Sequence, residues 1–139
     1  MSERVLVPID GSEMAERALE YALETHPDAE ITVLHIVGAP SPMMGGSAGL
    51  ALETDIDEAA RERATRVFDR ARELAEPHGI DLETDIALGS PAKVIVGRAE
   101  EYDTVVIGSH SGSLVDRLFV GNVAQKVVRH SPVPVTVVR

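Results

Sequence analysis

Hydrophobic and polar positions along the chain follow two alternating periods. Four short apolar runs, rich in β-branched residues, have the pattern of strands buried in a parallel sheet. These runs cover residues 5–9, 31–37, 104–107 and 133–138. A fifth segment, in which Leu82, Thr84 and Ile86 alternate with acidic residues, predicts a more exposed strand at a sheet edge.

Between these runs, apolar residues recur at helical spacing inside segments rich in Glu and Arg. Four helices are predicted, around residues 15–22, 54–78, 91–99 and 120–128. Pro77 and Gly79 close the long second helix, and Ser90 and Pro91 have the N-cap and first-turn pattern of the third. Residues 38–53 have no period and are rich in Gly and Pro, which predicts a long mobile loop, either functional or disordered.

Strands that alternate with helices predict an α/β fold, a doubly wound parallel sheet with helices on both faces. We expect one domain over residues 1–139 with five strands in the order 2-1-3-4-5 or 3-2-1-4-5. In either order, a ligand crevice lies beyond the carboxyl ends of the strands, where the winding direction reverses.

Composition excludes several classes of function. The 139 residues carry a net charge of −10, the wrong sign for binding a nucleic-acid backbone or an anionic membrane. Cys is absent, which excludes disulfides, thiolate metal sites and a Cys nucleophile. We find neither a signal-peptide pattern nor an apolar stretch long enough to span a membrane, so we expect a cytoplasmic protein that binds neither nucleic acid nor membrane.

Three features stand at predicted strand ends. Asp10 follows the first strand, the backbone of Ile36 ends the second, and Gly108 opens a Gly/Ser loop before the last helix. A strand, a Gly/Ser loop and a helix N-terminus together can aim backbone N–H groups at a phosphate. The alternative is that Asp10 is a turn or capping residue and that Gly108 and Gly112 mark turns.

Motifs of other phosphate-binding and catalytic sites are absent. Neither a P-loop nor a Gly-x-Gly-x-x-Gly fingerprint is present, and His110 occupies the middle position that Ser holds in Gly-x-Ser-x-Gly. The five His residues lack zinc-ligand spacing, and His35 has the position of a buried core residue. We therefore assign neither catalytic residues nor metal ligands.

Several segments, in this order, resemble the universal stress protein family of the UspA type over essentially the whole chain. They are 5–12 (VLVPIDGS), 34–37 (LHIV), 89–92 (GSPA), 104–110 (TVVIGSH), 117–124 (RLFVGNVA) and 127–138 (VVRHSPVPVTVV). The resemblance implies the strand order 3-2-1-4-5 of the adenine nucleotide alpha hydrolase-like fold. It also implies a homodimer joined through the last strand, here 133–138.

The resemblance further implies that ATP binds. We expect Mg²⁺ to bridge its phosphates, held mainly by them and by water. It places Asp10 at the ribose, the Ile36 backbone at adenine and Gly108 and Gly121 at the phosphates. The full set of implied nucleotide-binding residues is Pro8, Asp10, Ile36, Ile107, Gly108, Ser111, Gly112, Gly121, Asn122 and Val123.

This sequence departs twice from the motif of ATP-binding members, which is Gly-x-x-Gly, nine residues, then Gly-Ser/Thr. Ser111 stands at the second glycine position, with Gly112 one residue later, and Asn122 replaces the hydroxyl residue after Gly121. Ser111 adds a Cβ where a phosphate would approach, whereas the amide of Asn122 can still donate a hydrogen bond.

The sequence therefore predicts a stress-response protein that binds ATP or a related adenine nucleotide as a regulatory ligand in a dimer. One alternative is an interaction module of the same fold that binds no nucleotide. Another is a slow ATPase or small hydrolase that uses Ser109, His110 or Ser111. A flavin site is disfavoured because the chain has only two Phe, two Tyr and no Trp to flank the ring.

Overall fold

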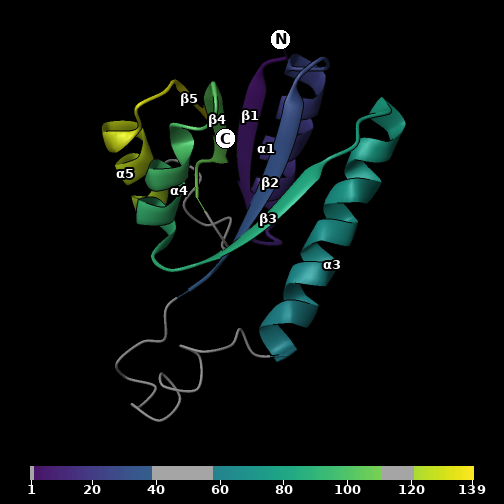
Figure 1. Cartoon of the computed structure of the whole chain (residues 1–139), viewed down its shortest axis with the longest axis horizontal. Coiled ribbons are helices and arrows are strands. Elements are labelled where there is room, and N and C mark those ends of the chain that lie inside the picture. Colours follow the sequence, from purple (N-terminus) through teal and green to yellow (C-terminus); the bar gives the residue numbers. More distant parts are fainter. Residues whose placement is uncertain (1, 39–57, 111–120) are drawn as a thin grey trace.

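The computed structural model describes residues 2–38, 58–110 and 121–139, and strands and helices alternate through them (Figure 1). The strands are β1 (Arg4–Ile9), β2 (Glu30–Val37), β3 (Glu83–Leu88), β4 (Thr104–Gly108) and β5 (Val135–Val138). The helices are α1 (Glu13–Thr25), α3 (Glu58–Ala75), α4 (Pro91–Ala99), α5 (Asn122–His130) and the 3₁₀ turn η2 (Glu76–His78).

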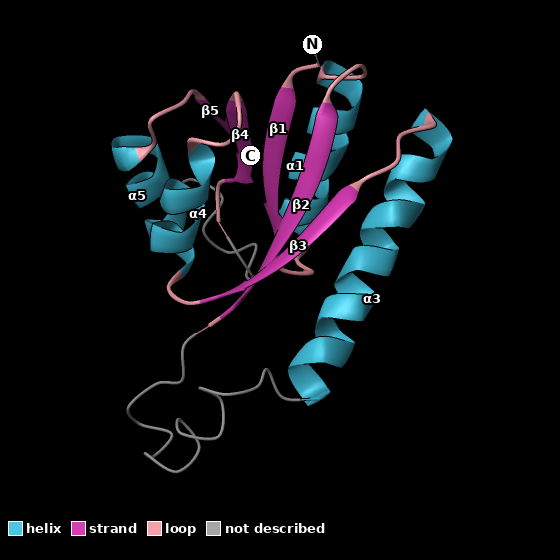
Figure 2. Ribbon diagram, in the orientation of Figure 1, coloured by secondary structure: helices cyan, strands magenta, loops and turns pink. Residues whose placement is uncertain are grey.

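The five strands form one parallel sheet in the order β3-β2-β1-β4-β5, which confirms the fold class and the order implied by the resemblance. Helices α4 and α5 cover one face of the sheet, and α1 and α3 cover the other (Figure 2). The chain reverses its winding direction between β1 and β4, so the switch point of the sheet lies between these two strands.

Alternate side chains of each central strand enter two separate cores because successive residues point to opposite faces. Val5 and Val7 of β1 pack with Leu19 of α1 on one face. Leu6 packs with Ile95 of α4 on the other face. All five side chains are essentially inaccessible to water. For the three residues of β1, the continuous apolar run predicted this burial, because such a run is typical of a strand covered on both faces.

Edges of the predicted elements differ from the structure in two places. The α-helix α3 ends at Ala75, and Pro77 continues as a 3₁₀ turn that Gly79 closes in the left-handed conformation, with φ 66°. β5 begins at Val135 rather than at 133, since the Ser131 hydroxyl bonds both backbone groups of Val133 in a turn.

The predicted loop over 38–53 lies outside the described residues apart from Gly38, as does the expected start of the long helix at 54–57. Among the helices of the described part of the chain, none is long and apolar enough to cross a bilayer.

Candidate functional site

The site begins with a break in the sheet at Pro8. The Asp103 N–H donates to the Arg4 carbonyl at 2.8 Å, so every second residue of β1 from Arg4 onward, Pro8 included, turns its backbone toward β4. Proline has no N–H to donate, and pairing between β1 and β4 is confined to Val5 and Leu6. The two strands therefore part at their carboxyl ends, at the switch point.

A cavity of about 620 Å³ opens at this parting, and we call it the switch-point cavity. It is lined by Pro8, Ile9, Asp10, Ser12, Ala15, Leu34, Ile36, Pro91, Ile95, Ile107, Gly108, His110, Gly121, Asn122, Val123 and Ala124. Eight of the ten candidate residues from the sequence are among them. Ser111 and Gly112, the other two, lie outside the described residues.

Asp10 occupies the turn between β1 and α1. Its Oδ1 accepts the Ser12 N–H at 2.9 Å, and the Ser12 Oγ accepts the Ala15 N–H at 3.2 Å as the N-cap of α1. Gly11, with φ 84°, allows the chain to reverse between them. Asp10 is therefore a turn residue, and its carboxylate is also held by this turn at the wall of the cavity.

Ile36 presents a carbonyl past the end of β1. The Glu30 N–H donates to the Glu3 carbonyl at 2.8 Å, which shows that Glu30, and by the two-residue alternation Ile36, turn their backbone groups toward β1. β1 ends at Ile9, opposite His35. The Ile36 carbonyl consequently lies beyond the last paired residue, at the rim of the switch-point cavity.

The two glycines of the candidate phosphate side have reasons internal to the protein. A Cβ at Gly108 would stand 2.7 Å from the Met14 Cγ and 3.1 Å from the Met14 carbonyl oxygen. A Cβ at Gly121 would stand 3.1 Å from the Ser109 carbonyl oxygen. Both glycines therefore permit close packing between elements, and this packing accounts for them without a ligand.

Among the described residues at this end, the backbone donors of Ser109 and Gly121 are already occupied. The Gly121 N–H donates to the Ser109 carbonyl, and the Ser109 N–H donates to the Val138 carbonyl at 2.8 Å. The first turn of α5 is different, because the leading N–H groups of a helix have no partner within it. Asn122, Val123 and Ala124 thus present the positive end of the α5 dipole at the cavity wall.

His110 brings the clearest unmet hydrogen-bonding capacity to this cavity. Neither of its buried ring nitrogens has a hydrogen-bond partner within the described residues, and the same is true of the buried Ser109 Oγ. Buried polar groups are normally satisfied, by protein, water or ligand. His35 differs, since its Nδ1 lies 3.2 Å from the Ile9 carbonyl in the core, which confirms its prediction as a core residue.

Sequence reasoning missed the apolar wall formed by Leu34, Ile95 and Pro91. Pro91 had a usable signal, since it opens the helix that follows β3, and the carboxyl ends of parallel strands share one edge of the sheet. Leu34 and Ile95 had none, because a core residue and a cavity-wall residue have the same hydrophobic pattern. Across residues 2–38, 58–110 and 121–139, the structure contains no cluster of three or more His, Cys, Asp or Glu able to hold a metal ion.

Comparison with known proteins agrees with this architecture. The profile of the universal stress protein family matches residues 1–139. The universal stress protein YxiE of Bacillus subtilis is 32% identical over 148 residues, covering 100% of both chains. Among solved structures, the universal stress protein UspA of Lactobacillus plantarum is 27% identical with a TM-score of 0.74, over 99% of this chain and 97% of that one.

A further solved universal stress protein is in complex with cAMP. It is 24% identical to this chain, with a TM-score of 0.70, over 99% of this chain and 97% of its own. At that identity the likeness shows that the two chains share the fold.

Proposed function

Because the chain belongs to the universal stress protein family, we propose that it binds an adenine nucleotide in the switch-point cavity as a regulatory ligand. The observation that carries this proposal is the meeting of Asp10, the Ile36 carbonyl and the first turn of α5 around one cavity of about 620 Å³. That volume lies within the 300–1,000 Å³ typical of small-molecule sites.

The chemistry of the cavity is arranged as a nucleotide requires. Leu34, Ile95 and Ile107 offer an apolar slot for a base, and the Ile36 carbonyl can accept from the amino group of adenine. The Asp10 carboxylate can accept from ribose hydroxyls. The N–H groups that open α5 favour a phosphate through hydrogen bonds and the helix dipole.

His110 adds a second line of support. Its orphaned ring nitrogens, at the same end of the cavity as Gly121 and Asn122, would be satisfied by a polar ligand. Solved universal stress proteins of this fold are in complex with cAMP, dAMP and AMP, so the fold accommodates adenine nucleotides in those proteins. In this chain, the proposal rests on the residues that line the switch-point cavity.

We further propose that the nucleotide is ATP and that the protein acts in the cytoplasm. We also propose that the site includes all the residues implied by the resemblance, Ser111 and Gly112 among them. Mg²⁺ would be held mainly by the phosphates and water, as this ion prefers.

We further propose a homodimer through residues 133–138, because β5 is an edge strand whose four half-buried residues are Val, Thr, Val and Val.

Isothermal titration calorimetry with AMP, ATP and adenine tests the nucleotide proposal. Asp10→Asn keeps the Oδ1 that accepts the Ser12 N–H but removes the charge offered to ribose. We expect the affinity for AMP to fall roughly tenfold, the scale of one charge-assisted hydrogen bond, while adenine, which lacks ribose, binds unchanged. Asp28→Asn, at an exposed residue outside the cavity, is the matched control.

Absence of heat with all three ligands would favour the nucleotide-independent interaction module. A phosphate-release assay separates the regulatory role from slow hydrolysis. We expect ATP to remain intact over hours, whereas release that disappears in His110→Ala would make this chain an ATPase.

A further inference from the structure

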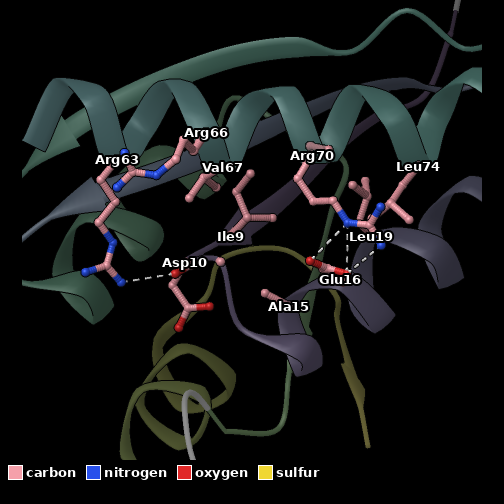
Figure 3. A pocket seen from close by; sticks show the side chains of 12 residues that line it. Ile9, Asp10, Ala15, Glu16, Leu19, Arg63, Arg66, Val67, Arg70 and Leu74 are labelled. Atoms are coloured by element: carbon pink, nitrogen blue, oxygen red, sulfur yellow. Dashed lines mark hydrogen bonds and ion pairs between the residues drawn. The ribbon is translucent and has the colours of Figure 1, made fainter.

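A second cavity, of about 360 Å³, lies on the opposite face of the sheet between α1 and α3 (Figure 3). We call it the arginine cavity, since Arg63, Arg66 and Arg70 line it from successive turns of α3. Its apolar surface comes from Ile9, Leu19, Val67 and Leu74. The cavity thus combines three guanidinium groups with an apolar floor, in a protein whose net charge is −10.

The three arginines are unequally engaged. Arg70 bonds Glu16 at 3.3 Å and Glu73 at 3.1 Å, and these hydrogen bonds, Glu16 first, raise the pKa of Arg70 above its usual value. Arg63 donates to the backbone carbonyl of Asp10 at 3.4 Å, a neutral and distant acceptor (Figure 3). Its positive charge is therefore left without a carboxylate within the described residues.

Arg66 stands between them along the helix, and within the described part of the chain its side chain makes neither a hydrogen bond nor an ion pair. In Figure 3 its side chain extends from α3 toward that of Arg63. Two like charges at i and i+3 on one helix repel each other unless something anionic lies between them. The carboxylates at the cavity wall, Asp10 and Glu16, are already held by the Ser12 N–H and by Arg70 respectively.

We propose that the arginine cavity binds a small organic anion, with a carboxylate or phosphate head on Arg63 and Arg66 and a short apolar body against Val67 and Ile9. The planar guanidinium fork matches both oxyanion heads, and two adjacent forks can share one head. The volume is at the lower end of small-molecule sites and suits a compact ligand. Most of its lining differs from that of the switch-point cavity, and Ile9, Asp10 and Ala15 contribute to the walls of both.

The test uses ¹⁵N NMR of the full chain titrated with hexanoate, butyl phosphate and hexan-1-ol. The two anions distinguish carboxylate from phosphate sources, and the alcohol has the apolar body without a charge. We expect the backbone signals of Gly11 and Val67 and the side-chain Nε–H of Arg66 to shift with one or both anions, and not with the alcohol. We also expect the affinity to fall as NaCl is added.

Arg66→Gln should weaken anion binding roughly tenfold or more, as loss of a charge-assisted hydrogen bond does. Arg61→Gln is the matched control, on the same helix, with the same change of charge and outside the cavity. Both arginines are exposed, and equal unfolding midpoints in urea will show that the variants fold alike.

The proposal is overturned if neither anion binds, if the alcohol binds as well as the anions, or if the two variants weaken binding equally. A parallel titration with AMP tests the nucleotide proposal separately from the anion site. We expect Arg66→Gln to leave AMP affinity unchanged, and a parallel loss of AMP binding would show a single site. Anion binding without AMP binding would support the arginine cavity and leave the nucleotide proposal alone refuted.

Discussion

At the scale of single residues, Gly108 and Gly97 show how one residue type meets two environments. Gly108 ends β4 against Met14 of α1, where a Cβ would come within 2.7 Å of the side chain and 3.1 Å of the backbone oxygen. Gly97 lies exposed in α4, with no atom within 4 Å of the same addition. Local sequence places one in a helix and the other at a strand end, but only the packing shows which of them has room for a Cβ.

We predict that Gly108→Ala lowers the free energy of unfolding by about 1–3 kcal/mol, the usual cost of overpacking a core position. Gly97→Ala should raise it by roughly 0.5–1 kcal/mol, because Ala is the better helix former and restricts the unfolded chain. Urea unfolding of the two variants checks both signs. Equal changes in the two would mean that β4 does not approach α1 as described.

At the scale of elements, α1 and α4 begin alike in sequence but differently in structure. Both have Ser at the N-cap. The Ser12 Oγ accepts the Ala15 N–H, whereas the Ser90 side chain makes no capping bond and Pro91 follows it. Ser90 therefore occupies the predicted N-cap position without a capping hydrogen bond, and the proline at the first helical position favours the helical φ.

We predict that Ser12→Ala destabilises the protein by about 1 kcal/mol, the typical value of an N-cap bond, and that Ser90→Ala changes stability by less than roughly 0.5 kcal/mol. Thermal and urea unfolding measure the difference. A Ser90→Ala loss as large as that of Ser12→Ala would show that the Ser90 hydroxyl caps α4 in solution.

At the scale of the whole molecule, the two edges of the sheet differ. β3 carries Glu83 and Asp85, and acidic side chains discourage edge pairing. β5 carries none. The Val105 N–H donates to the Pro134 carbonyl and the Ser109 N–H to the Val138 carbonyl, so the alternate residues of β5, Val135 and Val137, turn their backbone groups outward. Association between two copies should therefore use β5.

We predict that Val137→Pro prevents the proposed dimer from forming, because proline removes an outward N–H and stiffens the edge. Val137→Ala removes the side-chain packing but keeps the N–H, and we expect it to remain dimeric. Light scattering coupled to size exclusion gives both masses at micromolar concentration. A monomeric wild type, or dimers in both variants, would contradict pairing through this strand.

The fold and much of the candidate site could be predicted from the amino-acid pattern alone. A strand buried on both faces appears in the sequence as a continuous apolar run. A helix buried on one face appears as apolar residues at helical spacing, so the two elements leave different patterns. Parallel topology then brought Asp10, Ile36 and Gly108 to one edge, as expected, because carboxyl ends of parallel strands meet there.

Which groups at that edge are available to a ligand depends on contacts between segments distant in the sequence. Pro8 separates β1 from β4 because the missing N–H happens to face β4, and the Gly121 amide is occupied because Ser109 lies within reach. The arginine cavity likewise could not be predicted from the sequence. Its charge comes from α3 and its floor from β1 and α1, segments about fifty residues apart that meet only when both helices pack on one face of the sheet.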